Sequence, residues 1–178
     1  MKTLLMILIL LIISAYVFAK QSKTSEIKSV ENFEMEKYLG TWFEIARLPH
    51  MFEKGLEQVT ATYSLMENGK IEVLNRGYKS KKGKWTNAKG KAWVPDESRP
   101  SELKVSFFWP FAAAYRIIYM EEDYSLALVT SNSYDYFWML SRTPQIKDAY
   151  YKKLIKKAKD WGFETEKIIK VDQSMNLR

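Results

Sequence analysis

The sequence of 178 residues contains no cysteine and only one histidine, His50. Without cysteine the chain can form no disulfide framework, carry no catalytic thiol and accept no thiol-linked lipid. A Ser-His-Asp hydrolase would have to use His50, but no nucleophile-elbow motif lies near it, and we expect a surface histidine beside Pro49. The chain also lacks a metal-ligand cluster and a glycine-rich phosphate loop, so we expect no metal, no cofactor and no enzyme activity.

A dense basic patch is missing as well. The chain has 28 Lys and Arg against 21 Asp and Glu, a formal charge of +7, and its lysines are spread over separate segments such as residues 79–84 and 152–159. Nucleic-acid binding normally requires a denser patch, so we expect no nucleic-acid partner. The modest positive charge favours weak attraction to an anionic membrane surface.

The longest apolar run, residues 4–13, follows Lys2 and precedes Val17 and Ala19, two small residues that fit a signal-peptidase site before Lys20. The run is shorter than the roughly 20 residues that a bilayer-spanning helix needs. We therefore predict that residues 1–19 are a secretory signal, with an uncleaved membrane anchor as the alternative. The protein is then exported, either periplasmic, associated with the outer membrane, or secreted, and it carries no lipidated cysteine.

Short strands separated by turn residues at intervals of roughly ten predict an all-β fold, an eight-stranded antiparallel up-and-down β-barrel. The dipeptide Asn68-Gly69 is the strongest hairpin signal. The predicted strands are residues 41–48, 57–66, 70–78, 84–94, 102–109, 115–121, 125–131 and 135–141. We divide the exported part into an N-terminal segment (20–33), the barrel with its helix (34–172) and a C-terminal tail (173–178).

The pattern changes to a helix at about residues 144–161. Thr143 is expected to cap this helix and Gly162 to follow its end. Its apolar stripe should pack on the outside of the barrel, and residues 167–171 are a candidate further strand. The stripe consists of Ile146, Ala149, Tyr150, Leu154, Ala158 and Trp161. The helix also carries Lys152, Lys153, Lys156, Lys157 and Lys159, which most simply keep its outer face in water, with membrane contact as the alternative.

Three motifs resemble the lipocalin family: Gly40-Thr41-Trp42 at the start of the first strand, Asp123-Tyr124 in a late turn, and Arg142 after the last barrel strand. Residues 38–65, 103–111 and 140–144 are similar to the bacterial group of lipocalins, the group of outer-membrane lipoproteins to which apolipoprotein D is the nearest animal relative. The likeness extends from about residue 30 to 171. It implies a barrel, open at one end, that binds fatty acids or lysophospholipids for lipid transport and envelope maintenance. The lipoprotein members carry cysteine where this chain has Lys20, which favours a soluble protein.

In the family, the tryptophan of the first motif points into the closed end of the barrel and the arginine stacks across it. Carried over, Trp42 and Arg142 form a cation–π contact of about 0.5–2 kcal/mol. We expect these two residues, with Gly40, Asp123 and Tyr124, to close the barrel rather than to contact a ligand.

With Trp42 inside, alternation along the strands predicts a set of inward, ligand-binding side chains. Small residues among aromatic ones favour an open cavity over a filled core. Glu44 needs a partner or a raised pKa in such a place, and internal tyrosine, water or a ligand are the alternatives. The set is Glu44, Ala46, Val59, Ala61, Tyr63, Ile71, Val73, Ala88, Ala92, Leu103, Val105, Phe107, Ile117, Tyr119, Tyr136 and Trp138.

An aromatic run joins the fifth and sixth strands at the end opposite Trp42. Phe108, Trp109 and Phe111 are therefore candidates for contact with a membrane surface, unless this loop folds back on its own barrel. We predict an exported carrier of amphipathic lipids; its oligomeric state stays open between monomer and homodimer. The alternatives are a lipocalin-fold enzyme, an isomerase or de-epoxidase-like activity that would use Glu44, and a membrane-tethered barrel that recognises a partner.

Overall fold

The computed structural model describes residues 23–177, so the predicted signal or anchor at residues 1–19 lies outside the described residues. Within residues 23–177, no helix has the length and apolar character needed to cross a membrane.

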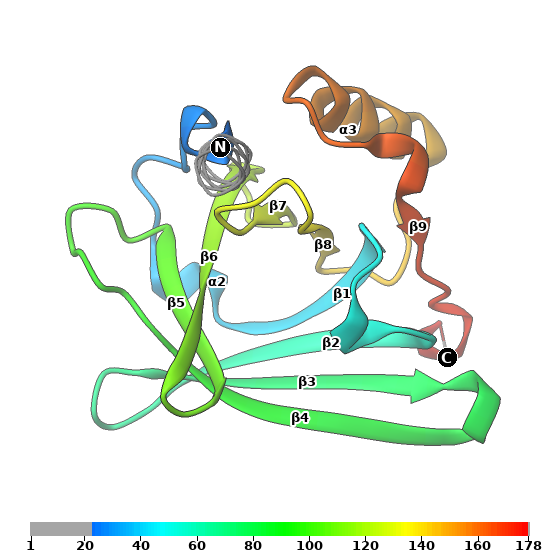
Figure 1. The fold of residues 1–178 in the computed structure, drawn as a ribbon, viewed down its shortest axis with the longest axis horizontal. Helices are drawn as coiled ribbons and strands as arrows, with labels where there is room; N and C mark the ends of the chain where they lie inside the picture. The colour runs from blue at the N-terminus through cyan, green and yellow to red at the C-terminus, as the bar shows by residue number, and fades with distance from the viewer. Residues whose placement is uncertain (1–22, 178) are drawn as a thin grey trace, which may run out of the picture.

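Eight strands form a closed antiparallel barrel (Figure 1). Each strand pairs with the next along the chain, and β1 pairs with both β2 and β8, which closes the sheet. The predicted fold class is therefore confirmed. The strands are β1 (Gly40–Arg47), β2 (Leu56–Leu65), β3 (Ile71–Lys79), β4 (Lys84–Trp93), β5 (Glu102–Phe108), β6 (Phe111–Met120), β7 (Leu126–Thr130) and β8 (Phe137–Ser141).

The meander gives the barrel two different ends. The chain enters β1 at Gly40, so the connections β2–β3, β4–β5 and β6–β7 lie at that end, which α2 (Met35–Tyr38) covers. The connections β1–β2, β3–β4, β5–β6 and β7–β8 lie at the opposite end. We call these the closed end and the open end.

Strand β6 begins at Phe111, four residues earlier than predicted, because Ala113 and Ala114 pair with Val105 and Lys104 of β5. Alanine has little strand preference, so residues 112–114 carry no strand signal. The β5–β6 hairpin is consequently tight, with Phe108 opposite Phe111 and a cis bond between Trp109 and Pro110.

The helix α3 (Asp148–Asp160) starts later than predicted, and Thr143 does not cap it. The Thr143 hydroxyl instead donates to the carbonyl of Gln145 at 2.8 Å, which holds a turn before the helix. Gly162 follows the helix end with φ +94°, as predicted. The buried face of α3, Leu154 and Ala158, packs against the outside of β7 and β8 (Figure 1).

Two further segments lie on the outside of the barrel. The short strand β9 (Ile169–Lys170) pairs with β1, so the predicted additional strand is present in a shorter form. The described part of the N-terminal segment contains η1 (Lys23–Glu26). The buried Arg116 of β6 fastens it by donating to the carbonyls of Thr24 and Ile27 at 2.7 and 2.6 Å.

The barrel wall is not level at the open end. Residues 91–93 of β4 pair with residues 104–106 of β5, and continuing that register places Phe108 opposite Lys89. Residues 84–88 of β4 therefore extend beyond the end of β5, still paired to β3. This overhanging part of the β3–β4 hairpin makes one side of the rim higher, as the long lower strands in Figure 1 show.

Candidate functional site: the barrel interior and its open end

The closed end is held by one tryptophan and one arginine. Trp42 is fully buried, and the guanidinium of Arg142 lies 3.9 Å from the centre of its ring. Arg142 also donates to the backbone carbonyls of Thr41, Lys37, Tyr38 and Leu39 at 2.7–3.1 Å. One side chain therefore binds α2 and the start of β1 to the end of β8.

The other residues of the family motifs lie at the same end. Gly40 has φ +94°, and a Cβ atom there would come within 3.3 Å of Arg142, so glycine suits this position. Asp123 accepts from the backbone N–H of Ser125 in the β6–β7 turn. The Tyr124 hydroxyl accepts from the N–H of Glu34, which fastens the segment before α2.

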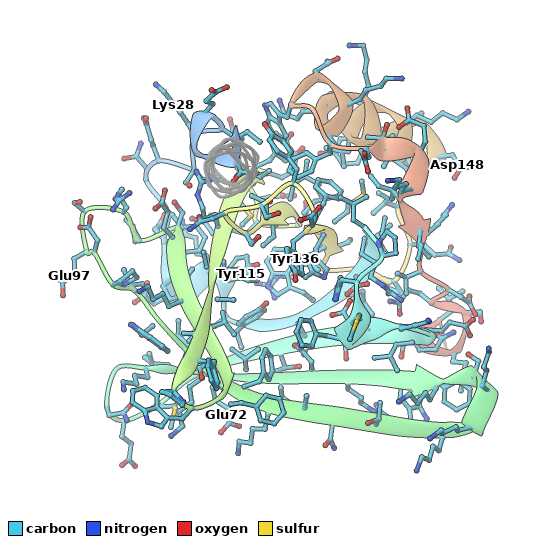
Figure 2. All side chains as sticks on the ribbon, viewed as in Figure 1. Lys28, Glu72, Glu97, Tyr115, Tyr136 and Asp148 are labelled. Carbon is cyan, nitrogen blue, oxygen red and sulfur yellow. The ribbon has the colours of Figure 1, made fainter. Side chains whose placement is uncertain are left out.

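Three tyrosines cover the floor of the interior. The hydroxyl of Tyr115 lies 2.5 Å from that of Tyr38 and 2.8 Å from that of Tyr63. Burial raises the pKa of all three, that of Tyr63 to about 12, so the hydroxyls are neutral at physiological pH. We did not predict Tyr115 from sequence, although its spacing of two from Ile117 carries the signal. Figure 2 shows Tyr115 and Tyr136 in the central region between the strands, and Lys28, Glu97 and Asp148 at the periphery.

Most of the predicted inward side chains do share this interior. Tyr63, Ile71, Val73, Ala92, Leu103 and Ile117 are buried in the cluster around Trp42, and Ala61, Val105, Phe107 and Trp138 pack against it. Val59 approaches Gly77 from inside, and Tyr136 stacks on Trp138 with ring centres 5.8 Å apart. Their contact with a ligand stays a prediction.

Two predicted inward residues face outward instead. A β-bulge between Glu44 and Ala46 shifts the pairing with β8, and a second between Ile117 and Tyr119 shifts the pairing with β7. Each bulge inserts one residue and reverses the alternation beyond it. Ala46 and Tyr119 therefore pack in the outer cluster under α3, and the prediction for them was wrong.

Because of the first bulge, Arg47 faces the interior and provides the partner that Glu44 needs. Its Nη1 donates to Glu44 Oε1 at 2.5 Å, and its Nη2 donates to the carbonyls of Glu53 and Leu56 at 3.0 and 2.8 Å. The Glu44 and Arg47 side chains are each 4% exposed. Arg47 thus pairs with the buried acid and fixes the β1–β2 loop to the barrel wall.

His50 is buried in the same place, so the expected surface histidine was wrong. Its side chain is 7% exposed, lies between Tyr136, Trp138 and Phe52, and has Nε2 3.2 Å from Glu53 Oε2. Neither ring nitrogen makes a well-oriented hydrogen bond within the part of the chain that the structure describes. The loop after Pro49 folds over the barrel wall, and a single sequence gave no signal for this.

The pKa values of the two carboxyls in this cluster, Glu44 and Glu53, are shifted in opposite directions. Burial and the nearby Glu53 carboxylate raise the pKa of Glu44 well above its usual value, against the opposing effect of Arg47. Burial acts to raise the pKa of Glu53 as well, but His50 and Arg47 outweigh it and hold the pKa below the usual range. A proton in this cluster therefore resides more readily on Glu44 than on Glu53.

Above the floor, the inner wall is lined by small and polar side chains. Ala88 faces the interior opposite Asn75, yet it is exposed. The Asn75 Oδ1 is buried and has no hydrogen-bond partner among residues 23–177. Buried acceptors are normally satisfied, so this part of the interior suits water or the polar part of a ligand.

The open end displays apolar side chains. The five most exposed large apolar residues of the described chain all lie there: Met51, Phe52, Phe108, Trp109 and Phe111, which are 77–88% exposed. The predicted aromatic run at residues 108–111 therefore does not fold back on the barrel. Among residues 23–177, no group of three or more His, Asp and Glu side chains is placed to hold a metal ion.

The closed barrel, the outer helix and the Trp42–Arg142 contact define the class of protein. The family model of the lipocalin-like domain matches residues 33–173. The chain therefore belongs to the lipocalin family.

Within that family, the chain is similar to bacterial outer-membrane lipoproteins. It is 46% identical over 148 residues to the outer membrane lipoprotein Blc of Vibrio cholerae, which covers 83% of this chain and 86% of that protein. It is 36% identical over 154 residues to mouse apolipoprotein D, covering 81% and 79%. A solved structure of the cockroach allergen Per a 4 superimposes with a TM-score of 0.66 at 22% identity, covering 84% and 94%, which supports the fold alone.

Proposed function

We propose that the chain is an exported lipocalin that binds and carries amphipathic lipids, namely fatty acids and lysophospholipids, in the bacterial cell envelope. The acyl chain lies among the inward apolar residues, and the head group lies near the open end. Storage, transport and membrane maintenance are the tasks that such a carrier serves.

The observation that carries this proposal is the decrease in side-chain size along the interior, from the closed end to the open end. The floor is packed with large side chains, whereas the wall nearer the open end carries the small Ala88 and, opposite it, Asn75, whose buried Oδ1 has no partner among residues 23–177. Ala88 faces inward and is exposed because it lies where β4 extends beyond β5, so it marks the mouth of the interior. An apolar wall with a few convergent polar groups is typical of small-molecule sites.

Binding of a fluorescent fatty acid tests the proposal directly. We expect its emission to increase on addition of the protein, and lysophospholipid to displace it, at micromolar concentrations. Ala88→Trp should weaken binding at least tenfold because the larger side chain narrows the mouth of the interior. Asn87→Trp is the matched control, since the side chain of residue 87 lies on the outer face of the same strand, next to Ala88 in sequence. Equal loss in both variants, or no binding by the unchanged protein, contradicts the proposal.

The location in the envelope is part of the proposal. It is supported by the relatives named as outer membrane lipoproteins and by the apolar run at residues 4–13. The chain has no cysteine to accept a lipid, so we place it in the periplasm, at the outer membrane or outside the cell without a lipidated residue. Fractionation and mass measurement of the purified protein test both points, and a mass that begins at Lys20 excludes the uncleaved anchor.

The enzyme alternative depends on Glu44 or on the cluster around it. Glu44 is only 3% exposed, and its partner Arg47 is engaged with Glu44, the β1–β2 loop and Glu53. These groups hold a loop, which favours a structural role over proton transfer to a substrate. Turnover of a small hydrophobic substrate that is lost in Glu44→Gln would favour the enzyme instead. The third alternative, a tethered barrel with a protein partner, requires the uncleaved anchor.

A further inference from the structure

We propose that the open end docks on an anionic lipid bilayer, with two apolar loops entering the interface and the tip of the β3–β4 hairpin lying on the charged surface. The docking surface consists of Met51, Phe52, Phe108, Trp109 and Phe111 with Lys54, Lys81, Lys82 and Lys84. The inference rests on the proposed lipid carrier, because it names the surface from which that carrier takes its ligand.

The two ends of the barrel differ sharply in exposed apolar side chains. At the open end, Met51 and Trp109 are 88% and 85% exposed, whereas the largest such value at the closed end is 58%, for Leu65. Soluble proteins normally keep large aromatic residues away from water. Aromatic side chains partition favourably into the membrane interface, where their rings lie at the level of the lipid head groups.

The loop that carries Met51 and Phe52 is held in this exposed arrangement. Its inner side chains, His50 and Glu53, are buried against Trp138, and the Arg47 guanidinium binds the loop carbonyls of Glu53 and Leu56. The loop therefore cannot turn its apolar residues inward without breaking the buried cluster. In the other hairpin, the Ser106 hydroxyl donates to the carbonyl of Phe111 at 2.6 Å, which fixes the base of the aromatic turn.

Charge favours an anionic surface. Lys54, Lys81, Lys82 and Lys84 are exposed, and no ion pair between described residues includes them. The acids of this end include Glu53, which the buried cluster holds, and Glu57, which accepts from Ser80. Asp172, which accepts from Gln58 and Ser174, and Asp135 are exposed there as well. On α3, Lys156 and Lys159 pair with Asp160 and Glu166, whereas Lys152 and Lys153 are exposed and form no ion pair with described residues. The helix differs from the open end because none of the exposed large apolar residues of the described chain lies on it.

Single fluorescent labels test the orientation cleanly because the chain has no cysteine of its own. An environment-sensitive dye is attached to Phe52→Cys or Phe108→Cys at the open end. The controls are Leu65→Cys at the closed end and Lys156→Cys on α3. With phosphatidylglycerol vesicles, we expect a blue shift and quenching by spin-labelled lipids at positions 52 and 108 alone. This outcome does not depend on whether residues 1–19 are cleaved, since a tether alone would not select one end.

Charge variants test the identity of the surface. We expect Lys81→Gln, Lys82→Gln and Lys84→Gln to weaken the response about fivefold for each lysine removed. Phosphatidylcholine vesicles and high salt should act in the same direction. The matched control is the triple variant Lys152→Gln, Lys153→Gln and Lys156→Gln on α3, which should bind as the unchanged protein does.

Three results would overturn the docking surface: equal responses at positions 65 and 108, equal loss in the two lysine variants, or a solution dimer that covers residues 108–111. Fatty-acid binding by the same variants separates this inference from the proposed function. If the labels respond but no lipid binds inside, the carrier fails and the docking surface remains. If lipid binds but position 108 stays in water, only the docking surface fails.

Discussion

Two tryptophans, one at each end of the barrel, lie under an arginine and yet contribute differently to the molecule. At the closed end, the Arg142 guanidinium is 3.9 Å from the centre of the Trp42 ring, and at the open end Arg76 is 3.8 Å from that of Trp85. Trp42 is fully buried, whereas Trp85 is half-buried on the overhanging hairpin. The same cation–π contact therefore contributes to a buried core at the closed end and to an exposed hairpin at the open end. Its contribution to stability depends on burial.

The largest expected effect is the loss of the buried ring. Trp42→Ala should lower the free energy of unfolding by about 3–5 kcal/mol because it leaves a cavity among Tyr38, Tyr63 and neighbouring apolar side chains. Trp85→Ala should cost about 1 kcal/mol or less, the value of an exposed contact. Urea unfolding followed by circular dichroism measures both. Similar losses in the two variants would show that the ends do not differ in this way.

The two arginines give the second test. Arg142→Lys keeps the charge but loses the planar fork that donates to four carbonyls, so we expect a cost of about 2–4 kcal/mol. Arg76→Lys should change the free energy of unfolding by about 0.5 kcal/mol or less, since that side chain is exposed. Thermal unfolding at one ionic strength compares them, and a tolerated Arg142→Lys would mean that charge alone closes the barrel.

Glu44, between the two ends, should make stability depend on pH. Burial raises its folded-state pKa above the usual value of 4.5, so the folded protein keeps a proton that the unfolded chain releases. The free energy of unfolding should therefore fall as pH rises above 4.5, by at most about 1.4 kcal/mol per pH unit, until pH passes the folded pKa. Glu44→Gln removes this decrease. Unfolding curves of the two proteins from pH 4 to 9 should converge at low pH and separate as pH rises; parallel curves contradict the assignment.

The smallest expected effect concerns the apolar loops. Phe108→Ser and Met51→Ser should change the free energy of unfolding by about 0.5 kcal/mol or less, because both side chains already lie in water in the folded protein. Guanidinium unfolding in the absence of lipid checks this. A large loss would mean that these residues pack within the barrel, which would weaken the contrast between the ends.

The sequence predicted the barrel well because most strands alternate apolar and polar residues between clear turns. Asn68-Gly69 forms the expected turn, with Gly69 at φ +74°. The late start of α3 was missed because the Thr143 hydroxyl bonds to the backbone of a local turn rather than to the N-terminus of the helix. Threonine is common both in such turns and at helix N-caps, so the residue type does not distinguish them.

The interior could be predicted only where alternation continues without interruption. One inserted residue in β1 exchanges Ala46 for Arg47 on the inner face, and no residue type marks that bulge. The partner of Glu44 consequently lies three positions away in the same strand, at a position that uninterrupted alternation would place on the outer face. The burial of His50 depends on a loop that folds over distant residues of β8, and such contacts leave no local pattern.

The uneven rim has a consequence for how the molecule can rest on a flat surface. Residues 84–88 extend beyond the end of β5, which at about 3.3 Å per residue adds roughly 15 Å along the strand, and less along the barrel axis because the strands are tilted. A barrel whose two rim heights both touch one plane must lean toward its shorter side, where Trp109 lies. In the proposed docking, the opening of the barrel then faces the bilayer at an angle. A lipid would enter the barrel obliquely instead of leaving the bilayer along its normal.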